Sequence, residues 1–123
     1  MMRRFEDSEA WKKARVWTRQ IYLVSDTGTF GKDFGLKDQI RRAAVSVMSN
    51  LAEGYERESD RDTMRFVSIA KGSAAEVRCQ LYIALDVGHL DRNTFVGLLE
   101  QGEEIARIIG GIRKSIQKRL DAR

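Results

Sequence analysis

The chain has 123 residues, is 42% hydrophobic, and carries 22 Lys and Arg against 18 Asp and Glu, for a net charge of +4. This length fits one folded domain, and no apolar run reaches the roughly 18–20 residues of a membrane-spanning helix. Because the N-terminus turns acidic at Glu6 and the chain has one Cys and one His, we expect a cytoplasmic protein without a signal peptide, disulfide framework, metal or cofactor.

Four segments show the apolar spacing of amphipathic helices, and the absence of Pro favours helices as well. The first covers about residues 8–25 and precedes a predicted loop over 26–31. The second covers about 36–54, where Gly54 predicts a left-handed stop. The third covers about 60–88, and Ser59 is its predicted N-terminal cap. The last covers about 92–120. The sequence therefore predicts an all-α, up-down antiparallel four-helix bundle, with residues 1–123 as a single domain.

Two of these helices carry more apolar residues than one bundle contact needs. Contiguous surplus residues of this kind indicate an oligomer interface, although a central helix that is buried on all sides would explain them too. The small pair Gly72-Ser73 would permit close helix packing nearby. The predicted interface residues are Val16 and Leu23 on the first helix and Ile69, Ile83 and Val87 on the third.

A polar stripe on the second helix contains Arg42, Asn50 and Glu53, and Glu76 lies among apolar residues of the third. A carboxylate in such surroundings needs a cation or hydrogen-bond donors. We therefore predict a structural network between helices or between protomers, with Glu53 and Glu76 as candidate partners of Arg42. Two carboxylates could also serve acid–base catalysis, but no nucleophile, metal triad or phosphate loop accompanies them. We expect neither a catalytic site nor a metal site.

The other chemically distinctive residues are interpreted as structural. His89 ends a helix without Cys or His at ligand spacing, so we expect it to act at a helix C-terminus. Cys79 stands alone and is expected to be a buried or interface thiol. Trp11 and Trp17 lie about two turns apart on the apolar face, which favours core packing over base stacking.

Two stretches are more particular than a generic bundle: QIRRAAVSVMSNLAEG over 39–54 and FVSIAKGSAAE over 66–76. With Phe5-Glu6-Asp7, the nearby Trp11 and Gly35-Leu36, they resemble the 23S rRNA intervening-sequence proteins over about residues 5–120. The resemblance implies a four-helix bundle, commonly a homopentamer, without catalytic activity. A related protein, the accessory subunit of diversity-generating retroelements, is a basic pentamer that engages nucleic acid and a reverse transcriptase. The loop over 30–34 lacks the Pro that the family often has there.

Basic stripes on the first and last helices carry the functional prediction. Several copies in one ring would multiply the charge of +4, and such a surface would bind phosphates with little sequence preference. We therefore predict a non-enzymatic oligomer that binds structured RNA or other nucleic acid. The alternative is a helical scaffold that binds a protein partner and no nucleic acid. The predicted phosphate contacts are Lys12, Arg15, Arg19, Arg107, Lys114 and Lys118.

Overall fold

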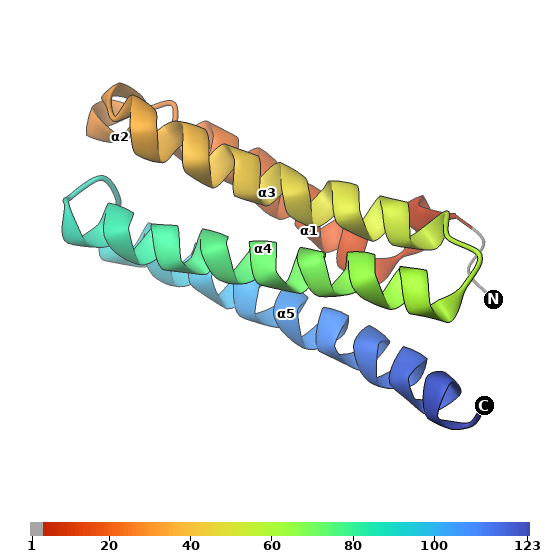
Figure 1. Ribbon diagram of the computed structural model, residues 1–123. Helices are drawn as coiled ribbons and strands as arrows, with labels where there is room; N and C mark the ends of the chain where they lie inside the picture. Colours follow the sequence, from red (N-terminus) through yellow and green to blue (C-terminus); the bar gives the residue numbers. More distant parts are fainter. Residues whose placement is uncertain (1–3) are drawn as a thin grey trace.

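The computed structural model describes residues 4–123, in which four long helices lie side by side along one axis (Figure 1). Consecutive long helices run in opposite directions, and no strand occurs within the described range. The all-α prediction is confirmed, while residues 1–3 of the predicted domain lie outside the described residues. The elements are η1 (Phe5–Asp7), α1 (Glu9–Val24), α2 (Gly28–Lys32), α3 (Phe34–Tyr55), α4 (Asp60–Asp86) and α5 (Arg92–Asp121).

A polar side chain caps the N-terminus of each long helix. Each cap accepts a hydrogen bond from the backbone N–H three residues further on, which satisfies one of the unpaired donors of the first turn. Ser59 was expected from the sequence, whereas the cap of α3 was not, and α3 begins two residues earlier than predicted. The four caps are Ser8, Asp33, Ser59 and Asp91.

Two glycines behave differently from what their positions suggest. Gly54 was predicted to stop α3, but the helix continues to Tyr55 and Gly54 is buried without a positive φ. A Cβ at Gly54 would lie 3.4 Å from Val67 Cγ2, an ordinary van der Waals distance, so Gly54 packs against α4 without a clash that would require glycine. Gly88 instead has a φ of +83° and ends α4, with the His89 N–H donating to the Ala84 carbonyl at 2.8 Å.

The predicted loop over 26–31 contains the short helix α2, which covers one end of the bundle. The His89 ring holds this helix in place, since its two nitrogens lie 2.8 Å from Thr29 Oγ1 and 2.9 Å from Asp33 Oδ2. The ring also stacks on buried Phe30, with centroids 5.2 Å apart. The hydrogen bond with His89 lowers the pKa of the Asp33 carboxyl. His89 therefore joins the α4–α5 turn to α2 and to the start of α3, beyond its expected role at a helix end.

The core is built where the four long helices face one another, with α3 packed most extensively on α4 and α1 packed on α3 and α5. Trp17 is fully buried, and its Nε1 donates to the Leu98 carbonyl at 3.0 Å. A Cβ at Gly102 would lie only 2.6 Å from Trp17 Cζ2, so this glycine makes room for the indole. Gly72, predicted to serve close packing, has no neighbour within 4 Å of such a Cβ. Within the chain, close packing at the predicted Gly72-Ser73 pair therefore involves Ser73, which is buried and whose Oγ lies 2.7 Å from Ser46 Oγ of α3, and does not involve Gly72.

Candidate nucleic-acid interface

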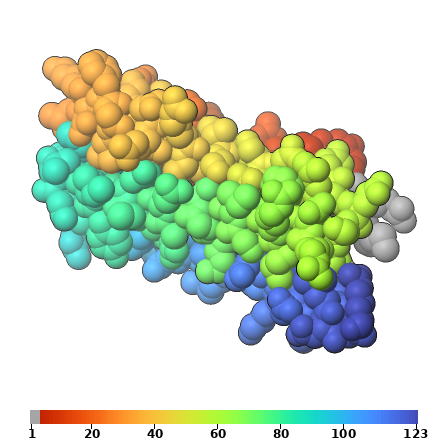
Figure 2. All heavy atoms as spheres, viewed as in Figure 1, coloured from red at the N-terminus to blue at the C-terminus, as the bar shows by residue number. Residues whose placement is uncertain are grey.

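The basic residues predicted on the last helix lie on one exposed face of α5. Arg107, Lys114 and Lys118 are all exposed, and none forms an ion pair with any residue in the range 4–123. The C-terminal turns of α5, drawn in blue, stand out at one end of the molecule (Figure 2). Lys13 is the main cause of the lowered pKa of the Glu104 carboxyl, but Arg107 contributes to it as well. Lys114 and Lys118 are therefore the cations of this face most available to a polyanion.

The last turns of α5, which carry Lys118, are anchored to the first turn of α4. The Asp60 carboxylate accepts hydrogen bonds from Arg119 at 3.2 Å and from Arg123. The hydrogen bond from Arg119 is the main reason that the pKa of Asp60 is lowered, so the carboxylate stays charged. This contact fixes the position of the basic face relative to α4.

Sequence reasoning left one cation out of the predicted site. Arg113 is half-buried at the edge of the basic face, and its Nε donates to Ser68 Oγ of α4 at 3.1 Å. Arg113 and Lys114 line a cavity of about 190 Å³ together with Met64, Gly110 and Gln117. The local charge excess of the C-terminal segment includes Arg113, but its contact with a residue 45 positions away comes only from the tertiary structure.

The other predicted basic stripe lies on α1. Lys12, Arg15 and Arg19 are exposed, and the Arg15 guanidinium lies 5.8 Å from the centroid of the Trp11 ring. Between the two basic stripes runs a neutralised seam, where Lys13 pairs with Glu104 at 2.7 Å. Lys12 lines a cavity at this seam together with Glu104, which lies one helical turn from Arg107.

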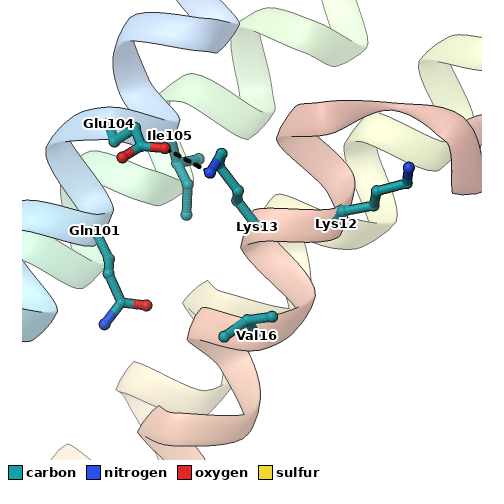
Figure 3. Close-up of a pocket in the computed structure, with 6 residues that line it drawn as sticks. All are labelled: Lys12, Lys13, Val16, Gln101, Glu104 and Ile105. Carbon is teal, nitrogen blue, oxygen red and sulfur yellow. Dashed lines mark ion pairs between the residues drawn. The ribbon is translucent and has the colours of Figure 1, made fainter.

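A shallow cavity of about 260 Å³ lies along this seam, with Val16 and Ile105 among its lining residues. In Figure 3 the Lys13 side chain reaches toward Glu104, whereas Lys12 points away from both. The cavity thus presents an apolar surface beside a paired charge and is a poor match for phosphate.

The predicted polar network is different in the structure. Arg42 pairs with Asp38 on its own helix at 2.8 Å, and Glu53 pairs with Arg57. Glu76 is exposed and forms no ion pair with a described residue. Arg42 therefore does not pair with Glu53 or Glu76 within the chain, because Arg42 and Glu53 each take a partner four residues away along the chain. Pairing between protomers stays a prediction.

The hydrogen bonds that do join α3 and α4 come from smaller side chains. Ser46 Oγ of α3 and Ser73 Oγ of α4 lie 2.7 Å apart, and Thr63 Oγ1 of α4 donates to the Gly54 carbonyl of α3 at 3.1 Å. Within α3, Asn50 Nδ2 donates to Ser46 Oγ at 3.0 Å. Asn50 thus belongs to a structural polar contact, as predicted, but with serines in place of charged partners. These polar contacts hold α3 and α4 together without forming a chemically reactive group.

The predicted oligomer interface is exposed in the single chain. This observation excludes the alternative that α4 is buried on all sides, and Cys79 on the same helix is exposed too, which excludes the buried thiol. Five large apolar side chains therefore meet solvent: Val16 at 53%, Leu23 at 59%, Ile69 at 43%, Ile83 at 44% and Val87 at 57% exposure.

Two other kinds of site are absent from the part of the chain that the structure describes. No three of its His, Cys, Asp and Glu side chains gather closely enough to hold a metal ion. None of its helices has the length and apolar content that crossing a membrane would need.

Comparison with known proteins shows the family of the chain and its similarity to a solved structure. The family model described as "23S rRNA-intervening sequence protein" matches residues 6–111. The chain is also similar to the crystal structure of a protein of unknown function from the S23 ribosomal protein family of Bacteroides thetaiotaomicron. That similarity has a TM-score of 0.79 at 21% identity and covers 85% of this chain and 98% of the other. No curated protein matches.

Proposed function

The chain belongs to the family of 23S rRNA-intervening sequence proteins, and from this premise we propose that it is a non-enzymatic cytoplasmic protein that binds structured RNA or another nucleic acid. The observation that carries the proposal is the exposed face of α5, where Arg107, Lys114 and Lys118 lack ion-pair partners among residues 4–123. Such cations gain most from phosphates, because binding releases counterions from the nucleic acid.

The chemistry of this face favours binding through the backbone of the nucleic acid. Lysine is a compact point charge that contacts phosphate oxygens, and phosphate contacts carry no sequence information by themselves. The face lies on a long helix whose end is tied to α4 through Asp60 and Arg119. We therefore expect recognition of a shape or a charge density, with a steep dependence on salt.

The double substitution Lys114→Glu and Lys118→Glu is expected to weaken RNA binding by at least about tenfold and to lower the salt slope by roughly 1.4–1.8, since two phosphate contacts are lost. The measurement is fluorescence anisotropy with a structured RNA hairpin and a matched DNA duplex over a salt series.

The charge-matched control is Lys32→Glu with Arg42→Glu, two exposed cations on α2 and α3. Equal affinities for the two double variants would contradict the assignment to α5. The absence of any binding by the unmodified protein at low salt would overturn the proposed function itself.

We further propose that copies of this chain associate through the exposed apolar residues of α1 and α4. The support is that α4 presents Ile69, Ile83 and Val87 to solvent on one side, which is uncommon for a stable monomer. In this proposal a second copy of the chain covers these side chains. It therefore replaces, for this surface, the alternative of a scaffold that binds a different protein.

Replacing Ile69 and Ile83 with Glu is expected to turn an oligomer into a monomer without loss of helix content, because burying two carboxylates at an interface is costly. Light scattering coupled to size exclusion measures the mass, and circular dichroism measures the helix content. The control is Val96→Glu on α5, which is similarly exposed. A monomeric unmodified protein at micromolar concentration would overturn self-association and leave the surface to a different protein partner.

A further inference from the structure

We propose that the cavity between α4 and α5 binds one phosphate group, with Arg113 and Lys114 as its ligands. The inference rests on the proposed function and deepens it, because it names the group that the basic face recognises and the residue that orients it. The shared chemistry is a phosphate oxygen, which a nucleic-acid backbone or free inorganic phosphate could supply. We assign the site to the backbone phosphate.

The Arg113 guanidinium is oriented by a contact with α4. Its Nε donates to Ser68 Oγ at 3.1 Å, which ties the side chain to α4 and restricts its rotamers. The two terminal nitrogens form no hydrogen bond within residues 4–123, and neither is a buried atom left without a partner. With Nε occupied, the end-on pair of N–H groups is what remains, and that pair matches two phosphate oxygens.

A concave space lies beside this guanidinium. The cavity of about 190 Å³ is lined by Met64, Gly110, Arg113, Lys114 and Gln117. A Cβ added at Gly110 or at Gly111 would have no neighbour within 4 Å, so the packing of this chain does not require either glycine. Glycine inside a helix costs about 0.5–1 kcal/mol relative to alanine, and here it leaves the floor of the cavity open.

The charged residues that line the cavity are both positive. Arg113 and Lys114 have no ion-pair partner in the described part of the chain. The nearby Asp121 carboxylate accepts a hydrogen bond from Gln117 at 2.8 Å. Excess positive charge therefore surrounds a concave space of suitable chemistry for an anion.

Three single variants test the site in the full-length protein. Arg113→Gln removes the charged fork, Ser68→Ala removes only its orientation, and Gly110→Leu fills the cavity with a side chain that helices favour. Matched controls are Arg42→Gln for the lost charge, Ser49→Ala for the lost hydroxyl and Gly97→Leu for the added side chain, all at exposed positions. The probes are a labelled RNA hairpin in a salt series and inorganic phosphate followed by isothermal titration calorimetry.

We expect Arg113→Gln to weaken RNA binding about tenfold and to lower the salt slope by about 0.7–0.9, the contribution of one phosphate contact. Ser68→Ala should weaken binding about threefold with the slope unchanged, because the charge remains. Gly110→Leu should weaken binding by about fivefold or more while the thermal midpoint stays the same or rises. A variant that binds less RNA only because it is misfolded would instead show a lower thermal midpoint of unfolding.

The possible failures of the two proposals are distinguishable. If the unmodified protein binds no RNA at low salt, the proposed function fails and the backbone-phosphate site fails with it. If it binds RNA with a steep salt slope but the three variants match their controls, the cavity is not a phosphate site, while the proposed function stands. If Arg113→Gln abolishes binding of inorganic phosphate and leaves RNA binding unchanged, the assignment to backbone phosphate is overturned.

Discussion

Replacing Trp17 with Ala is expected to lower the free energy of unfolding by about 3–5 kcal/mol, as for other large buried aromatic residues. Trp17 is fully buried, and its indole fills the space where α1 meets α5. The substitution also removes the hydrogen bond from Nε1 to the Leu98 carbonyl, which links residues 81 positions apart. Urea denaturation followed by circular dichroism measures the loss.

Trp11→Ala is the matched control for this substitution. Trp11 lies on the same helix but is only partly buried. Its ring packs edge to face against the Phe5 ring, with the two centroids 5.0 Å apart. Trp11→Ala should lower the free energy of unfolding clearly less, because folding buries less apolar area at this position. Trp17→Phe keeps most of the volume and isolates the hydrogen bond. An equal loss for Trp11→Ala and Trp17→Ala would contradict the assignment of Trp17 to the centre of the core.

Replacing Gly102 with Ala is expected to destabilise the protein by about 1–3 kcal/mol through overpacking. The added Cβ would lie 2.6 Å from Trp17 Cζ2 and 3.0 Å from Arg78 Cγ, and real Cβ atoms do not approach a ring carbon that closely. In an open helix the same change would raise stability, because alanine favours the helix by about 1 kcal/mol. The unfolding midpoint in urea shows which effect wins.

Gly97→Ala provides the opposite outcome on the same helix, since its Cβ would meet nothing within 4 Å. We expect this variant to gain about 0.5–1 kcal/mol. In the double variant Gly102→Ala with Trp17→Ala, the new methyl would enter the space that the indole vacates. The combined loss should therefore be smaller than the sum of the single losses. A stabilised Gly102→Ala variant would contradict the close approach of α1 and α5.

Several features of this protein could be predicted from the sequence because they depend on neighbours along the chain. Apolar spacing of three and four residues predicts four long helices close to those of the structure, since this spacing places residues on one face of a helix. The same periodicity predicts which cations lie on the exposed face of α5 and leaves Ile69, Ile83 and Val87 off the core stripe. Local capping chemistry likewise indicates the start of α4 at Ser59.

The roles of the glycines were decided by the tertiary structure. Gly54, Gly88 and Gly102 are the same residue type, yet one packs against α4, one takes a positive φ and one makes room for Trp17. The difference depends on which helix lies opposite each glycine and at what distance. Sequence spacing describes the face of one helix but does not describe its rotation and register against another.

The partners of the polar residues depend on the same rotation and register. Arg42 turns out to pair with Asp38, within reach on its own helix, while Arg113 is oriented by Ser68 from 45 residues away. The helices and their exposed faces thus follow from the sequence by itself, because each is a property of one segment. The candidate phosphate cavity requires the packed α4–α5 pair, because its lining combines Met64 of one helix with Gly110 and Arg113 of the other.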